Sequence, residues 1–297
     1  MAAPLRRLAP AKVNLYLHVL GRRTDGYHLL DSLVAFAGVF DRLEAAPAED
    51  LSLTVTGPAA AALRRKGARA NLVTSAARLL AEAGSVKKGA RMRLFKRVPV
   101  GAGLGGGSAD AAAALRLLSE LWNLRLPEED LRRLGSRLGA DVPVCLEGRA
   151  AFVGGIGETV DPAPPLPPAC LVLASSGMAL PTERVYGAYA GVPARPVRFS
   201  ATPGNAAALA CLLAERCNDL ERTARRLLPA VGSVLAALRD LEGCLLARMT
   251  GSGAACFGLF DDEPRARAAA RSLKAAHPRW WVAAAPLLGT ADPRPLS

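Results

Sequence analysis

Hydrophobic and polar residues alternate along several short segments of the chain, and this period of two predicts β-strands. The clearest segment is VNLYLHV at residues 13–19, in which four aliphatic residues share one face and Asn, Tyr and His share the other. Further strands are predicted at 51–56, 91–98, 170–175 and 280–288, and residues 245–260 are predicted as a strand, a tight glycine turn and a second strand. Together these segments predict sheet in both halves of the chain.

Between the strands, apolar residues recur at helical spacing. Asn71 is a suitable N-cap for a helix that continues to Gly84. Other helices are predicted from Ser108 onward, and at 127–138, 231–243 and 265–276. Helices and strands mix without strict alternation, so we expect an α+β fold in both halves.

The best domain boundary is DPAPPLPPA at residues 161–169, which holds five prolines in nine residues. It predicts an N-terminal domain at 1–160 and a C-terminal domain at 161–297. Residues 191–205 are expected to form a loop-rich insert.

The charge of the chain favours an anionic partner. The formal net charge is +12 and the sequence pI is about 10.0. Aromatic residues make up only 5% of the chain, which is poor material for stacking nucleic-acid bases, and the basic residues are dispersed. We therefore expect a solvated basic surface and a small-molecule partner, with no nucleic acid.

Six cysteines lie mostly in apolar runs, and no pair has C-x-x-C spacing. They are expected to be reduced and buried, as is typical of a cytoplasmic protein. The three histidines have no spacing that suggests a catalytic triad or a zinc site. No apolar run is long enough to span a membrane, so no membrane association is expected.

The stretch PVGAGLGGGSAD, residues 99–110, places five glycines within seven residues, between a predicted strand and a helix. Glycine permits positive φ and close approach of the backbone, and the start of a helix attracts anions. The stretch therefore predicts a phosphate cradle. A Walker A loop is excluded because no Lys follows the glycines, and the match to a dinucleotide G-x-G-x-x-G motif is weak. A flexible loop without a ligand is the alternative.

Two charged residues are candidates for phosphoryl-transfer chemistry. Asp141 lies in RLGADVPV, where Pro143 is expected to hold Val142 extended and the carboxylate at a fixed elbow before a strand-like run. It could act as a base or serve only as a turn residue. Lys12 is one of only 6 lysines among 38 basic residues. It could supply a cation or be a solvated residue near the start of a strand.

Tyr27 and His28 follow a DG turn and could stack on and hydrogen-bond a base. A half-buried tyrosine beside a surface histidine would look the same in the sequence.

Four segments taken together resemble the GHMP kinases, in the same order and spacing over nearly the whole chain. They are APAKVNLYLHVLGRRTDGYHLLDSL, PVGAGLGGGSAD, LGADVPV and MTGSGAACFGLF. The resemblance implies a two-domain fold, with an N-terminal βα domain and a C-terminal ferredoxin-like α/β plait. It implies a small-molecule kinase that uses ATP and Mg²⁺, acting as a monomer or homodimer.

The resemblance also assigns site residues. Lys12 and Asp141 are implied as catalytic, with Asp141 taking the proton of the substrate hydroxyl and Lys12 stabilising charge on that oxygen. The implied ATP-phosphate loop consists of Pro99, Val100, Gly101, Ala102, Gly103, Leu104, Gly105, Gly106, Gly107, Ser108 and Ala109.

The DGYH segment is similar to members whose substrate is a cytidine diphosphate sugar alcohol. By that similarity Tyr27 and Tyr186 hold the cytosine ring between them and His28 reads its edge. Asn14 and Thr182 line the substrate side, and the segment at Thr250–Gly253 closes the site. A kinase for another alcohol and a non-catalytic basic RNA-binding protein are the alternatives.

One position departs from the family pattern. The family usually has two serines after the glycines, whereas here Ala109 follows Ser108. The ligands of a metal ion therefore stay unassigned by the sequence.

Overall fold

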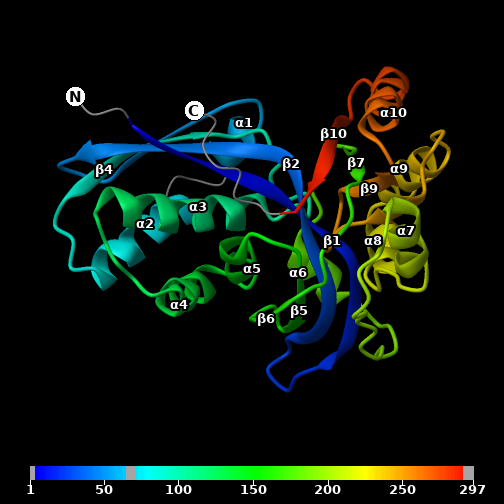
Figure 1. Cartoon of the computed structure of the whole chain (residues 1–297), viewed down its shortest axis with the longest axis horizontal. Helices are drawn as coiled ribbons and strands as arrows, with labels where there is room; N and C mark the ends of the chain where they lie inside the picture. The colour runs from blue at the N-terminus through cyan, green and yellow to red at the C-terminus, as the bar shows by residue number, and fades with distance from the viewer. Residues whose placement is uncertain (1–3, 65–70, 290–297) are drawn as a thin grey trace.

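The structure is a computed structural model, and the residues that it describes are 4–64 and 71–289 (Figure 1). The N-terminal half consists of β1 (Leu5–Arg22), β2 (His28–Ala48), β3 (Ser52–Thr56), α1 (Ala60–Arg64), α2 (Leu72–Ala83), β4 (Gly89–Phe95), α3 (Gly106–Leu121), α4 (Glu128–Leu138), α5 (Val142–Glu147), β5 (Ala151–Gly155) and β6 (Thr159–Pro162). The C-terminal half consists of β7 (Cys170–Ser175), α6 (Thr182–Gly187), α7 (Ala206–Ala214), α8 (Glu221–Leu227), α9 (Ala230–Arg239), β8 (Leu246–Met249), β9 (Cys256–Phe260), α10 (Glu263–Ala276) and β10 (Trp281–Leu288).

A long antiparallel hairpin of β1 and β2 is the spine of the molecule (Figure 1). β2 also pairs with β5 near its start and with β4 near its end, and β3 adds to β4 in parallel. α2 and α3 pack together, and α3 lies against both β1 and β2. This helix–sheet layer buries one large apolar core in the N-terminal half.

The C-terminal half has the strand order β10-β7-β9-β8, with every neighbouring pair antiparallel. In chain order, β7, a helical segment, β8, β9, α10 and β10 follow one another, which is the ferredoxin-like arrangement. The α+β prediction and the two-part fold are therefore confirmed. β10 also pairs with β2 through Leu287 and Leu288, so the two sheets are continuous.

Both faces of β1 are buried, although its alternating pattern predicts a polar face. Every residue from Ala9 to Val19 is buried. The reason is that the C-terminal half covers the polar face: Thr250 accepts a hydrogen bond from the backbone of Asn14, and Asn218 forms a parallel bridge with Leu17. Polar side chains that are buried in this layer need hydrogen-bond partners, and some of these side chains form part of the candidate active site.

Most predicted helix ends are confirmed. The Asn71 side chain caps α2 by accepting from the Val73 N–H at 2.9 Å, and Gly84 ends that helix. α3 begins at Gly106, two residues before the predicted start at Ser108. The strand-like run after Asp141 was a wrong prediction: Val142 is the first residue of α5, because a proline is tolerated within the first turn of a helix.

The prediction of buried cysteines is right for Cys170 and Cys256 and wrong for Cys211 and Cys217, which are exposed. All six thiols are free. In space His18 lies beside Cys217 and Asp219, a grouping that the spacing of the histidines in the sequence does not reveal. Within residues 4–64 and 71–289, no helix is both long and apolar enough to cross a bilayer.

Candidate active site

A cleft of about 860 Å³ lies where the glycine loop, Pro99–Ala109, meets both halves of the molecule. Of the residues assigned individually from the sequence, all but one line this cleft: Lys12, Asn14, Tyr27, His28, Pro99–Ser108, Asp141, Thr182 and Tyr186. The exception is Ala109, which is 3% exposed and packs into the core between the helices and the sheet. From the predicted segment Thr250–Gly253, Gly251 and Ser252 line the cleft. The structure therefore gathers segments from across the sequence around one hollow.

Gly101, Gly103 and Gly105 of the glycine loop all have positive φ, at +72°, +79° and +60°. A side chain at Gly101 would enter open space. A Cβ at Gly103 would lie 2.7 Å from the carbonyl oxygens of Thr250 and Gly253, and a Cβ at Gly105 would lie 2.8 Å from the Cβ of Lys12. Two of the three glycines are thus required by close approach as well as by φ.

The glycine loop leads directly into α3. Gly105 is the N-cap residue and offers no side chain to the first turn. The free N–H groups and the dipole at the start of this 16-residue helix favour an anion at the end of the loop. This position beside the cleft suits the phosphates of a nucleotide.

Lys12 and Asp141 form an ion pair inside the cleft. The Lys12 Nζ lies 3.0 Å from the Asp141 Oδ2, and the lysine side chain is 5% exposed whereas the aspartate side chain is 41% exposed. Lys12 also donates to the Asn14 Oδ1 at 2.9 Å, and Asn14 donates to the Ser32 hydroxyl at 2.8 Å. The buried ammonium group is therefore held by Asn14 and Asp141, while the carboxylate is partly exposed at the cleft.

Asp141 is held at the N-terminus of α5, after the glycine at which α4 ends. The turn at Asp141 is confirmed, but the extended Val142 on which the predicted elbow rests is wrong, because Val142 begins a helix. The approach of the carboxylate to Lys12 joins the α4–α5 turn to β1.

The segment Thr250–Gly253, here called the closing turn, covers the glycine loop from the C-terminal half. The Ala255 N–H donates to the Ala102 carbonyl at 2.9 Å, just beyond the closing turn. The Thr182 and Ser252 hydroxyls share a hydrogen bond of 2.8 Å. The C-terminal half thus contributes backbone and hydroxyl groups to the cleft wall.

Aromatic rings gather at the other end of the cleft. The His28 ring lies 5.3 Å from the Tyr186 ring and 5.8 Å from the Tyr189 ring, measured between centroids. Tyr27 is 59% exposed, and the ring contacts recorded for residues 4–64 and 71–289 do not include it. The structure therefore brings His28 and Tyr186 together and leaves Tyr27 at the rim.

Burial is the main cause of the pKa shifts in this aromatic group. It lowers the pKa of His28, helped by the nearby Arg22 charge, and so favours the neutral imidazole. Burial, together with the negative charge of Asp141, raises the pKa of the Tyr186 hydroxyl. Neutral hydrogen-bonding groups at this end suit an uncharged base.

Sequence reasoning missed a buried triad beneath the glycine loop. The Lys96 Nζ contacts the Asp41 Oδ2 and lies 2.6 Å from the Asp110 Oδ2, and all three side chains are buried. Burial, with Asp41 nearby, raises the pKa of Asp110 to about 7 despite the opposing charge of Lys96. The available signal was Lys96 itself, a rare lysine in phase with the buried Met92 and Leu94 of β4.

The chain matches the model "GHMP kinases N terminal domain" over residues 71–149 and the model "GHMP kinases C terminal" over residues 200–279. The chain belongs to the GHMP kinases. A curated relative from Paramagnetospirillum magneticum is 56% identical over 94% of this chain and 97% of its own, and one from Rhodospirillum rubrum is 51% identical over 95% and 92%. Both are named 4-diphosphocytidyl-2-C-methyl-D-erythritol kinase.

A solved structure of 4-(cytidine 5'-diphospho)-2C-methyl-D-erythritol kinase superposes on this GHMP kinase with a TM-score of 0.77. It is 41% identical, and the match covers 96% of this chain and 100% of the other. The similarity therefore extends over both halves of the molecule and includes the cleft between them.

Proposed function

We propose that this GHMP kinase transfers the γ-phosphoryl group of ATP to the 2-hydroxyl of 4-diphosphocytidyl-2-C-methyl-D-erythritol, a step in the synthesis of isoprenoid precursors. The names of its close relatives support the substrate. The observation that carries the chemistry is the Lys12–Asp141 pair, 3.0 Å apart and directly beside the glycine loop. A base and a cation thus stand next to a cradle for the donor phosphates.

In this mechanism Asp141 accepts the proton of the attacking hydroxyl, which frees an oxygen lone pair for the γ-phosphorus. Asp141 is exposed enough for a substrate to reach it, because its side chain is 41% exposed and the residue lines the cleft. Lys12 is fixed by Asn14 and stabilises negative charge on the attacking oxygen. The loop glycines bring backbone N–H groups to the phosphates without steric hindrance.

The residues beside the loop also fit Mg²⁺. The Asp110 Oδ1 is buried, and no residue of the described chain hydrogen-bonds to it. Ser108 lines the same cleft. Carboxylate and hydroxyl oxygens are hard ligands that suit Mg²⁺, so we propose these two as its protein ligands. The ion, when bound, offsets the charge of the triphosphate. Ala109 supplies no hydroxyl.

The aromatic end of the cleft is proposed to hold the cytidine. Tyr186 and His28 offer adjacent ring faces, and Tyr27 would close over the base from the rim. Thr182 and Asn14 also line the cleft and are proposed to contact the substrate. We propose the boundary of the domains, 1–160 and 161–297, at the proline-rich segment that joins β6 to β7.

A coupled ADP-release assay tests the proposal with three acceptors: the cytidine diphosphate sugar alcohol, homoserine and mevalonate. We expect turnover with the first acceptor alone, and phosphorus NMR should show a new phosphomonoester on the sugar alcohol. Turnover with another alcohol instead would contradict the proposed substrate but would still support kinase activity. RNA binding without any turnover would overturn the kinase itself.

A further inference from the structure

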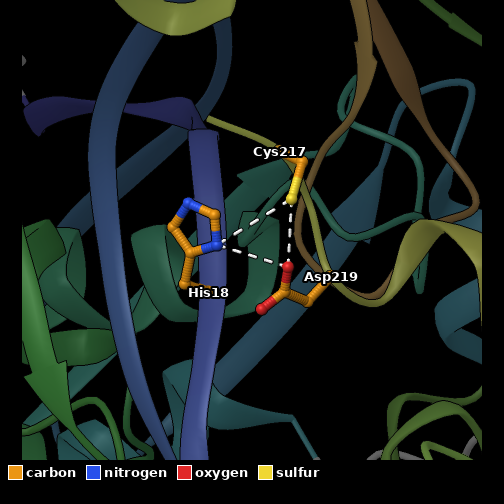
Figure 2. A group of neighbouring side chains, drawn as sticks. All are labelled: His18, Cys217 and Asp219. Atoms are coloured by element: carbon orange, nitrogen blue, oxygen red, sulfur yellow. Dashed lines mark hydrogen bonds and ion pairs between the residues drawn. The ribbon is translucent and has the colours of Figure 1, made fainter. Parts of the chain in front are cut away.

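A cluster of three metal-ligating side chains lies outside the cleft (Figure 2). His18 is on β1, and Cys217 and Asp219 flank Asn218 in the segment between α7 and α8. The His18 Nδ1 lies 3.2 Å from the Asp219 Oδ1 and 3.9 Å from the Cys217 Sγ, and the Cys217 Sγ lies 3.0 Å from the same carboxylate oxygen. One nitrogen, one sulfur and one oxygen therefore converge on a common point.

We propose that these three side chains form a binding site for a thiophilic divalent transition ion, of which Zn²⁺ is the type. Zinc bonds of about 2.0–2.3 Å at tetrahedral angles separate neighbouring ligand atoms by roughly 3.3–3.6 Å. The three observed separations bracket that range, so adjustments of about half an ångström would complete the geometry. The mixed nitrogen, sulfur and oxygen set suits zinc and does not suit Mg²⁺, which takes oxygen ligands.

The backbone already fixes the ligands in place. The Leu17 N–H donates to the Cys217 carbonyl at 3.0 Å, and the Asp219 N–H donates to the Leu17 carbonyl at 2.9 Å. The second carboxylate oxygen of Asp219 accepts from the Val19 N–H at 2.8 Å. Two segments about 200 residues apart in sequence are thus in register, and only the side chains need to move to bind an ion.

The charge and access of the cluster also fit a divalent ion. A thiolate, a carboxylate and a neutral imidazole together carry two negative charges. In the free protein the Cys217 thiol donates to Asp219, and the His18 Nδ1 lies 3.2 Å from the same carboxylate oxygen. Metal binding would release the thiol proton to solvent as the Sγ–metal bond forms, and would leave the proton of the neutral imidazole on Nε2 so that Nδ1 can bind the ion. His18 is buried whereas Cys217 is exposed, so an ion can enter from the thiol side and keep a water as its fourth ligand.

The site would stabilise the contact between the two halves of the molecule. Asn218, between the two ligands, donates to the carbonyl oxygens of Met249 and Gly251, both at 2.8 Å. The closing turn that covers the glycine loop is therefore anchored by the residue between Cys217 and Asp219. A metal ion here would fasten β1, the 217–219 segment and that turn together, without touching the substrate.

Cobalt substitution tests the site directly. Full-length protein, reduced and stripped of metal with a chelator, is titrated with Co²⁺ and followed by absorption spectroscopy. We expect one Co²⁺ per chain, with a near-ultraviolet sulfur-to-cobalt charge-transfer band and the intense visible bands of tetrahedral cobalt, all displaced by Zn²⁺. Cys217→Ser should abolish the charge-transfer band, and Asp219→Asn should weaken binding at least tenfold.

Cys211→Ser is the matched control, because Cys211 is also an exposed thiol but lies outside the cluster. It should keep the charge-transfer band unchanged. In addition, Zn²⁺ at a hundredfold excess over its Kd should raise the Tm of the wild type by roughly 5 °C and leave that of Cys217→Ser unmoved. Absence of stoichiometric cobalt uptake, or a band that survives Cys217→Ser, overturns the proposal.

Discussion

The two ends of the cleft are built by different means. At the phosphate end, main-chain contacts fix the site: the Lys12 N–H donates to the Leu104 carbonyl at 2.9 Å, and glycines let the loop lie against Lys12 and the closing turn. At the base end, side chains form the site, and Tyr27 is 59% exposed. The proposed phosphate end is therefore fixed by main-chain contacts, whereas the proposed base end depends on side chains, one of which is largely exposed.

The largest effect should come from Asp141, the proposed base. Asp141→Asn keeps the shape of the side chain but removes the proton acceptor, so kcat should fall by roughly 10²–10⁴-fold. Nucleotide binding, measured by calorimetry, should change little because the glycine loop is intact. A variant that keeps most of its kcat would exclude Asp141 as the base.

The buried triad should dominate stability at the phosphate end. Lys96→Met leaves the buried carboxylates of Asp41 and Asp110 without their counter-charge, which should lower the free energy of unfolding by about 3–5 kcal/mol. Urea denaturation measures the change. Lys88→Met is the matched control, because Lys88 is exposed and should shift stability by less than about 0.5 kcal/mol. Equal effects at both lysines would contradict a structural role for the triad.

Local features of the fold could be predicted from the sequence, whereas contacts between distant segments could not. Local patterns give the strand, glycine loop and helix at 89–121 and the caps of α2, because hydrogen bonding and periodicity act over a few residues. The ferredoxin-like order and the roles of Lys12 and Asp141 come from resemblance to the GHMP kinases. Local patterns in the sequence could not show that Lys12 and Asp141, which are 129 positions apart, form an ion pair.

Two groups escaped prediction because their members meet only through the fold. Asp41 lies on β2, Asp110 on α3 and Lys96 directly after β4. Burial of an ion pair leaves no local signature beyond a rare lysine in phase with apolar residues. His18 and Cys217 come together across 199 residues, through the parallel bridge beside Leu17. The helix after Asp141 was missed because the first turn of a helix tolerates the same proline that disfavours helix elsewhere.

Two glycines of the glycine loop test whether kcat depends on close approach to Lys12 or only on the positive φ of the loop. Gly105→Ala and Gly101→Ala both put a side chain at positive φ, but only the first places a Cβ against Lys12. If Lys12 has its proposed role, displacing it should reduce kcat by up to about 10²-fold, since misplacement of a catalytic group by about 1 Å has an effect of this size. Gly101→Ala should lose less than about tenfold. Steady-state kinetics measures kcat for both variants. Equal losses of kcat would show that φ strain alone is responsible.

The base end should show the most selective effects. Stacking of a base on an aromatic ring contributes about 1–3 kcal/mol, so Tyr186→Ala or Tyr27→Ala should weaken substrate binding by roughly 5- to 150-fold, while Tyr→Phe at either position should be mild. His28 should add discrimination against a uridine substrate, because the exocyclic amine of cytosine becomes a carbonyl there. The measurement is kcat/KM for cytidine and uridine substrates in the wild type, the tyrosine variants and His28→Ala.

Loss of Tyr27 should reduce kcat/KM less than loss of Tyr186, because the exposed Tyr27 ring must first be ordered over the base, which opposes part of its stacking energy. Unchanged preference for cytidine in His28→Ala would show that the histidine packs against Tyr186 without reading the base, and the recognition of cytosine would then have to come from the cleft backbone.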